Sequence, residues 1–227
     1  EVTREKRQNR TTISRIRMNL IFDSEHVKVY DDVLPAEDFD ILFEWFNKIP
    51  LFFPQSEGVW TEVWDANTDV LKGQPFYFPT GKIPPLDGID KAVIPVIEKV
   101  STVIQYGKVA MSPYYYMAGS GLRWHNDSSY KEAFTFYCHK HWSPDWGGEF
   151  MTIDLKEEDK NIVWKRFDNQ ELFDLIVSRG IGQFFHPKPN RLIVNSGILH
   201  KINETNKKSS ARLTLQGFIS NYGTPSN

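Results

Sequence analysis

Apolar and polar residues alternate in short stretches over the second half of the chain, which is the pattern of β-strands. The stretches are residues 109–116, 134–139, 149–155, 191–195 and 212–219. Residues 19–22 and 26–33 show the same pattern near the start. Many short strands with turn residues between them predict a sandwich or a barrel, in which side chains point alternately into and out of the core.

Helical periodicity occurs in three shorter parts of the chain. Within residues 36–48, apolar side chains recur every three or four positions, after a proline and two acidic residues that suit a first helical turn. A second helix fits residues 89–106, with a kink near Pro95. Residues 170–177 also have helical spacing. The chain is therefore predicted to be mainly β with flanking helices.

Residues 50–88 are rich in aromatic side chains, prolines and glycines but have no clear period. So long a stretch without periodicity is more often a functional loop than a plain connector. One interpretation is that part of it covers an active site and that Trp60 and Trp64 contact the substrate. The other is that these aromatic side chains pack against the helices.

Length and composition favour one domain. The chain has 227 residues, of which 40% are hydrophobic, enough for one substantial core. We predict a single domain over residues 19–222, preceded by a basic, disordered leader over residues 1–18. The formal net charge is −2, which provides no global electrostatic reason to bind nucleic acid.

Cysteine usage and hydropathy indicate the compartment. Cys138 is the only cysteine, so an internal disulfide framework is excluded and a reducing cytosol is suitable. No run of about 18 apolar residues is present to span a membrane, and no apolar segment opens the chain as in a signal peptide. The sequence predicts a cytoplasmic protein without a membrane partner, and it makes no prediction of the oligomeric state.

His125, Asp127 and His200 are candidate ligands of a metal ion. In an extended segment, residues two apart point the same way, so His125 and Asp127 can hold one ion together. His200 must then come from another strand, and the predicted strand 191–195 lies just before it. Two imidazoles and one carboxylate on one side of a metal leave the other side open, which suits non-haem Fe(II) enzymes. An H-x-D pattern alone arises often by chance.

The order of the motifs around these residues is more specific. Along the chain, the metal candidates are accompanied by Tyr116-Met117-Ala118-Gly119, Gly147-Gly148-Glu149-Phe150, Pro189-Asn190-Arg191-Leu192 and Arg212. This order resembles the prolyl-4-hydroxylase-like branch of the Fe(II)- and 2-oxoglutarate-dependent oxygenases. The resemblance implies a double-stranded β-helix, or jelly-roll, core over about residues 105–220. It also implies Fe(II), 2-oxoglutarate and O2, with ascorbate as a candidate reductant.

The same resemblance suggests how the cosubstrate is held. Arg212 falls on the strand after His200, where this branch places a basic residue that binds the far carboxylate of 2-oxoglutarate. A guanidinium offers that carboxylate a planar, two-pronged match, and Thr214 shares the strand face of Arg212. A surface ion pair is the alternative for Arg212. Tyr116 and Tyr137 are weaker candidates for cosubstrate hydrogen bonds, with core packing as the alternative.

Residues next to the metal motif are candidates for the substrate side. Arg123 and Trp124 immediately precede His125, and His139 follows a predicted strand. His139 also begins an H-x-H motif that, with Glu149, imitates the metal motif of a cupin. A cupin would need that glutamate closer and a glycine-led approach to the first histidine. The other interpretation of His139 is a partly buried position or one at the rim of the site.

These residues predict an enzyme that hydroxylates an unactivated C–H bond and releases succinate and CO2. The resemblance favours a prolyl, peptide or amino-acid-like substrate. Asp127 argues against halogenation, because related halogenases replace this carboxylate by a small residue to admit chloride. The alternatives are a specialised small metabolite that is hydroxylated, desaturated or cyclised, a cupin-type metal enzyme, or a silent binding module. An inactive relic would be free to lose any of the candidate ligands.

Overall fold

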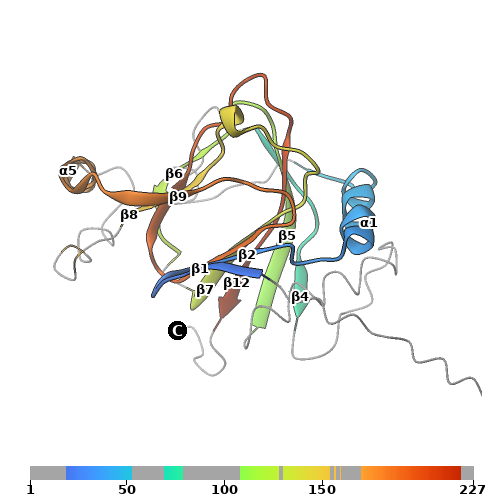
Figure 1. Ribbon diagram of the computed structural model, residues 1–227, viewed down its shortest axis with the longest axis horizontal. Helices are drawn as coiled ribbons and strands as arrows, with labels where there is room; N and C mark the ends of the chain where they lie inside the picture. Colours follow the sequence, from blue (N-terminus) through green and yellow to red (C-terminus); the bar gives the residue numbers. More distant parts are fainter. Residues whose placement is uncertain are drawn as a thin grey trace, which may run out of the picture.

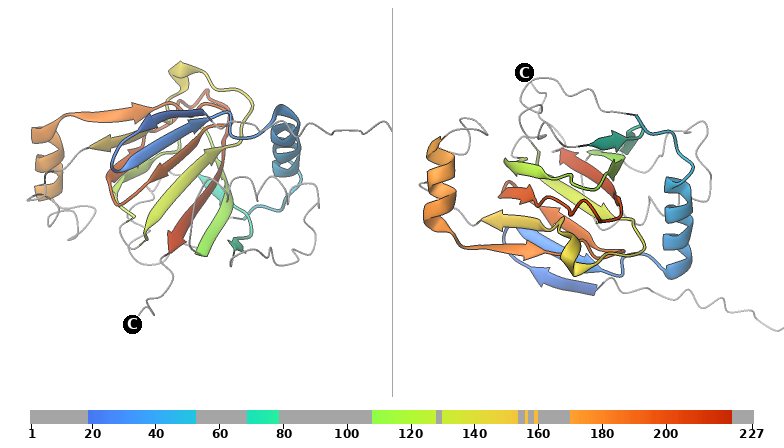
Figure 2. Two further views of the ribbon diagram at one scale, coloured as in Figure 1. Left: turned by 60° about the horizontal axis from the view of Figure 1, so that its bottom comes forward. Right: turned by 90° about the horizontal axis from the view of Figure 1, so that it is seen from above.

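The structure is a computed structural model, and it describes residues 19–52, 69–78, 108–127, 130–153, 156, 159 and 170–220. The predicted leader, the predicted helix 89–106, Trp60 and Trp64 lie outside these described residues. The two helices of the described part are α1 (Ala36–Phe46) and α5 (Gln170–Arg179). They match the predictions for residues 36–48 and 170–177, and they lie on opposite sides of the strands (Figures 1 and 2).

The strands of the described residues form two antiparallel sheets. The larger sheet has the order β1-β2-β10-β7-β12-β5-β3, with β4 also paired to β5, and the smaller has the order β6-β11-β8-β9. Their bounds are β1 Asn19–Asp23, β2 Val27–Asp31, β3 Val70–Lys72, β4 Phe76–Phe78, β5 Lys108–Tyr116, β6 Leu122–His125, β7 Glu132–Tyr137, β8 Phe150–Ile153, β9 Gly182–Phe185, β10 Leu192–Asn195, β11 Leu199–Ile202 and β12 Arg212–Ser220.

From β5 onward the chain passes between the two sheets at nearly every connection, since only β8 and β9 are consecutive strands in one sheet. This connectivity is that of a double-stranded β-helix, so the predicted jelly roll is confirmed (Figure 1). The strands β3 and β4 correct one expectation, because they lie within residues 50–88, where a loop was predicted. Each has three residues, which is too short to show a period of two.

The two faces of the larger sheet differ in chemistry. Its outer face is apolar and packs under α1, whose buried side chains are Phe39, Leu42, Trp45 and Phe46. Leu213, Leu215 and Phe136 are among the sheet residues in this core. The alternate residues of the same strands, including Arg212 and Thr214, project from the inner face toward the smaller sheet. The outer face thus forms one apolar core, whereas the inner face carries polar groups beside a second apolar cluster that includes Val27, Val29 and Ile193.

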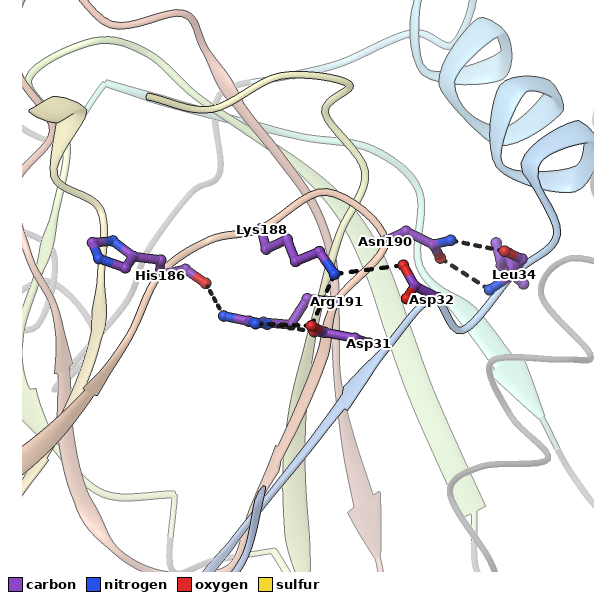
Figure 3. A network of polar contacts seen from close by, with 7 residues as sticks. All are labelled: Asp31, Asp32, Leu34, His186, Lys188, Asn190 and Arg191. Carbon is purple, nitrogen blue, oxygen red and sulfur yellow. Dashed lines mark hydrogen bonds and ion pairs between the residues drawn. The ribbon is translucent and has the colours of Figure 1, made fainter. Parts of the chain in front are cut away.

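A polar network fastens the end of β2 to the segment before β10 (Figure 3). The buried Asp31 carboxylate accepts hydrogen bonds from Arg191 Nε at 2.7 Å, Arg191 Nη2 at 3.0 Å and Lys188 Nζ at 2.9 Å. Asn190, with a φ of 61°, places its side-chain amide against the backbone of Leu34. The network joins the entry to α1 with the strand that leads to His200.

Replacement of Asp31 by asparagine should destabilise the protein by about 2 kcal/mol at pH 7, between the values for exposed and buried ion pairs. Burial acts to raise the pKa of Asp31, but hydrogen bonds and charges from Arg191 and Lys188 outweigh it and lower the pKa. The stabilisation is therefore fully present above the unfolded pKa of about 4 and is lost as the pH falls through the lower folded pKa.

Urea unfolding of Asp31→Asn and wild type at pH 7 and pH 3 measures this effect. The control is Asp23→Asn, because Asp23 is 3.9 Å from Lys28 and both side chains are about half exposed. The free energy of unfolding of Asp23→Asn should fall by less than about 0.5 kcal/mol. Equal losses in the two variants, or an Asp31→Asn loss that does not shrink at low pH, would contradict the assigned role.

Candidate metal centre

The pairing of β6 with β11 brings two histidines together. His200 is opposite His125 and Ile202 is opposite Leu122, so two steps along β11 match three along β6. This bulge shifts the alternation of β6, so that Leu122 and His125 both face the interior while Trp124 faces outward. The two imidazole centroids are 4.3 Å apart.

Asp127 completes the predicted trio. Its Oδ2 lies 3.4 Å from Nε2 of His200, and the ligand atoms of His125, Asp127 and His200 all lie within 4.8 Å of one another. Their exposed fractions are 4%, 7% and 4%, respectively. Asp127 follows the end of β6, and its carbonyl accepts a hydrogen bond from the backbone N–H of Tyr130. The three predicted ligands therefore converge inside the protein.

Backbone carbonyls orient both rings. Nδ1 of His125 lies 2.7 Å from the carbonyl oxygen of Arg123, and Nδ1 of His200 lies 2.9 Å from that of Ile198. A carbonyl only accepts, so each Nδ1 carries the hydrogen and each Nε2 keeps its lone pair for a metal. Burial and the neighbouring His200 lower the pKa of His125 to about 4. Phe150 stacks on the His200 ring at 5.0 Å.

This donor set fits a divalent transition metal. Neutral imidazole nitrogens and a carboxylate oxygen are the ligands of non-haem Fe(II) sites, in which one side of the metal stays open. Hydrogen bonds from the non-ligating nitrogens to carbonyls are the usual second interaction of metal-bound histidine. His125, Asp127 and His200 are thus able to hold such an ion without rearrangement of their rings.

Arg212 projects from the inner face of the larger sheet and is 1% exposed. Its Nη1 donates to the Gly148 carbonyl at 3.2 Å, and its guanidinium lies 4.3 Å from the ring centroid of Tyr116. Its Nε and Nη2 have no hydrogen-bond partner in the described part of the chain, where no carboxylate pairs with it. Burial lowers the pKa of Arg212, and the charge of Glu149 acts against this shift. Buried donors without hydrogen bonds are costly, so Nε and Nη2 are suited to bind an anion.

Two hydroxyl groups beside Arg212 are also buried without partners among the described residues. They are Thr214 Oγ1 and the Tyr137 hydroxyl. Thr214 is opposite Tyr137 in the sheet, so both share the inner face with Arg212. Burial raises the pKa of Tyr137 to about 12, which keeps its hydroxyl a neutral donor. Tyr116 differs, because its hydroxyl lies 2.9 Å from Gln216 Oε1 and hydrogen-bonds to it.

Two further polar residues face the same interior and were missed from the sequence. Thr152 is opposite His200 on β8, and its buried hydroxyl has no partner in the part of the chain described. The same is true of Nδ2 of Asn195 at the end of β10. Thr152 stands in a short apolar stretch of the sequence, where nothing marks it. Only the register against His200 reveals its position.

The predicted substrate residues are scattered. Trp124 packs with Leu172, Leu199 and Ile176 on the outer side of the smaller sheet, away from the face of His125. Arg123 is exposed at the bulge of β6.

His139 is buried rather than at a rim. Its Nε2 lies 2.6 Å from the carbonyl oxygen of Pro187, which links the end of β7 to the segment before β10. Burial lowers the pKa of His139 to about 4, so the ring is neutral at pH 7.

No protein-family model and no curated protein sequence matches the chain. Several solved structures are similar. A prolyl-4-hydroxylase from Pseudomonas putida has a TM-score of 0.54 at 13% identity, over 88% of this chain and 95% of that one. A prolyl hydroxylase from Trichoplax adhaerens, in complex with a hypoxia-inducible-factor peptide fragment, has a TM-score of 0.55 at 10% identity, over 87% and 84%.

HygX from Streptomyces hygroscopicus, with nickel and 2-oxoglutarate bound, has a TM-score of 0.53 at 11% identity, over 91% of this chain and 87% of that one. A second HygX structure also contains hygromycin B. At such identities these similarities establish a shared fold. The described residues contain no helix that is both long and apolar enough to cross a membrane.

Replacement of His200 by alanine should weaken Fe(II) binding more than about 100-fold. Loss of a group that only hydrogen-bonds to a metal ligand already lowers metal affinity roughly 10–100-fold, and loss of the ligand itself should lower it further. Anaerobic titration calorimetry measures the affinity, and circular dichroism checks that the fold persists. The control is His26→Ala, because His26 is a partly exposed histidine outside the trio. Unchanged Fe(II) affinity in His200→Ala would remove His200 from the metal centre.

Proposed function

We propose that the protein is an Fe(II)- and 2-oxoglutarate-dependent oxygenase, in which residues 19–222 form one domain. The observation that carries this proposal is the buried guanidinium of Arg212, whose Nε and Nη2 have no hydrogen-bond partner and which forms no ion pair among the described residues. It faces the same interior as the open-sided trio of His125, Asp127 and His200. A cupin-type metal enzyme would need the trio but would have no use for Arg212.

A 2-oxo diacid matches both halves of this arrangement. Its 2-oxo acid end is a bidentate metal chelator, and an Fe(II) ion held by His125, Asp127 and His200 would have an open side on which to bind it. Its far carboxylate suits the free Nε and Nη2 of Arg212, which offer two parallel hydrogen bonds. The hydroxyls of Thr214 and Tyr137 supply additional donors on the same face.

When bound, Fe(II) supplies the activation of O2, coupled to conversion of 2-oxoglutarate into succinate and CO2 and to oxidation of a substrate C–H bond. The residues of this chain do the positioning. Carbonyls of Arg123 and Ile198 hold the two imidazoles, and Phe150 covers the His200 ring. Burial of the trio excludes bulk water and strengthens every charge interaction inside.

For the substrate we propose a prolyl, peptide or amino-acid-like molecule that is hydroxylated. The complex of the similar Trichoplax adhaerens prolyl hydroxylase with a peptide supports this choice. A specialised small metabolite is the second candidate, because the similar HygX structure contains hygromycin B. Asp127 supports hydroxylation over halogenation, since it fills the position that chloride would need.

We also propose ascorbate as a reductant and the cytoplasm as the compartment. A reducing medium keeps iron as Fe(II) and is consistent with the free, buried thiol of Cys138.

Arg212→Gln should weaken 2-oxoglutarate binding by about 3 kcal/mol, or roughly 100-fold, because it removes the charge that a buried carboxylate requires. Thr214→Val should weaken 2-oxoglutarate binding by about 1 kcal/mol, which is the net contribution of one neutral hydrogen bond. Calorimetry with Zn(II)-loaded protein measures binding, and succinate formation under air with Fe(II) measures turnover.

Lys201→Gln is the control, because Lys201 contacts Trp124 on the outer side of the smaller sheet. It should match wild type in both measurements. Full 2-oxoglutarate affinity in Arg212→Gln, or turnover that persists in His125→Ala, would contradict the proposed function. Metal binding without any 2-oxoglutarate binding would favour the cupin-type interpretation.

A further inference from the structure

Lys72 is the last residue of β3, on the edge of the larger sheet. The register places Lys72 opposite Tyr114, Tyr114 opposite Thr214, and Thr214 opposite Tyr137. Directly opposed residues in an antiparallel sheet project from the same face. Lys72 therefore projects from the inner face, in one row with two of the residues assigned to the cosubstrate.

The Lys72 side chain lies against a pair of tyrosine rings. Its Nζ is 5.4 Å from the ring centroid of Tyr114, and that ring stacks on Tyr116 at 5.9 Å. The guanidinium of Arg212 lies over the Tyr116 ring, 4.3 Å from the ring centroid. Each of two stacked tyrosines thus has a cation on its ring. In the proposed function, Arg212 binds the far carboxylate of 2-oxoglutarate. The cosubstrate therefore does not require Lys72, the second cation on this face.

No carboxylate or other hydrogen-bond acceptor in the described residues contacts Nζ of Lys72. Lys140 offers a contrast, because it lies over the Phe43 ring but also pairs with Asp40 at 2.7 Å. Lys72 is partly buried, and this burial lowers its pKa, which indicates an ammonium group short of compensating contacts. An anion would supply the missing interaction.

The Tyr114 ring also connects Lys72 with the metal centre. Burial raises the pKa of Tyr114, and the negative charge of Asp127 is among the further causes, after Tyr116 and Tyr130. Tyr114 and Lys72 are both only partly buried, so neither is sealed inside the core.

We propose that Lys72 binds a carboxylate of the primary substrate and thereby selects substrates that carry a free carboxylate over those that lack one. This inference rests on the proposed oxygenase function and assigns a substrate class to that site. An ammonium group pairs with a carboxylate as a point charge, through hydrogen bonds of about 2.7–2.9 Å. The carboxylate belongs either to a free amino acid or to an acidic side chain in a peptide, and these sources require separate probes.

The direct test follows the Lys72 amine by NMR in the full chain loaded with Zn(II) and 2-oxoglutarate. Lysines are reductively methylated with ¹³C, and the signals of Lys72 and Lys201 are assigned from Lys72→Arg and Lys201→Arg. Lys201 is a matched control, because its Nζ lies 5.9 Å from the centroid of Trp124 but on the outer side of the smaller sheet. The probes are the common free L-amino acids, their C-terminal amides, and N-acetyl aspartate and glutamate amides.

At least one carboxylate probe should shift the Lys72 signal, with a dissociation constant at least about 10-fold lower than that of its neutral amide. The Lys201 signal should stay constant. A shift with free amino acids alone identifies an α-carboxylate, and a shift with the acetylated acidic amides identifies a side-chain carboxylate. A Lys72 signal that no probe moves, or that neutral amides move equally, would overturn the proposal.

The activity test uses the best probe in the succinate assay. Lys72→Gln should raise KM for that acid about 10–100-fold while KM for 2-oxoglutarate stays constant, and Lys72→Arg should restore most of the loss. Lys201→Gln should match wild type.

The two proposals fail differently in these tests. Wild-type protein that neither binds nor consumes 2-oxoglutarate would disprove the oxygenase function itself. Normal 2-oxoglutarate turnover with an unchanged KM for the acid in Lys72→Gln would disprove only the role of Lys72.

Discussion

The bulged pairing of β6 with β11 is the constraint on which the rest of the site depends. A strand with regular alternation would place either Leu122 or His125 on the interior face, because they are three residues apart. The extra residue in β6 lets both face inward, one in the apolar core and the other toward the metal position. It also turns Trp124 outward, where α5 covers it. This one irregularity thus positions both a candidate metal ligand and a packing contact.

The larger sheet buries apolar residues on both faces, but its buried polar side chains without partners lie on the inner face. Its outer face and α1 form an apolar core, in which stabilisation grows with the area removed from water. Its inner face buries Arg212, Thr214 and Tyr137, whose unpaired groups lower the stability of the free protein. Ligands that satisfy these groups bind the folded state alone and so stabilise it. The unsatisfied interior is therefore better understood as a preorganised binding surface than as a packing defect.

Segments with a clear period were predictable from the sequence, as were the four-residue strands β8 and β10, but the other short strands were not. Residues 212–219 and α1 show clear periods of two and of three to four residues, respectively. The strands β6, β9 and β11 have four residues each, and β3 has three. A stretch that short has no measurable period, and pairing with neighbours determines its conformation. For this reason Lys72 received no role from the sequence, and Thr152 received none because only strand pairing sets its register against His200.

The sequence by itself determined which chemistry is available. Two histidines and an aspartate suit a metal, the motif order resembles the prolyl-4-hydroxylase-like branch, and an arginine follows on the last strand. Only the tertiary structure decided which polar residues meet. In the structure, His139 hydrogen-bonds to Pro187, Trp124 lies on the outer side of the smaller sheet, and Lys72 projects from the inner face of the larger sheet. The physical reason is that local sequence sets the alternation of side chains, whereas strand register and bulges decide which face each one occupies.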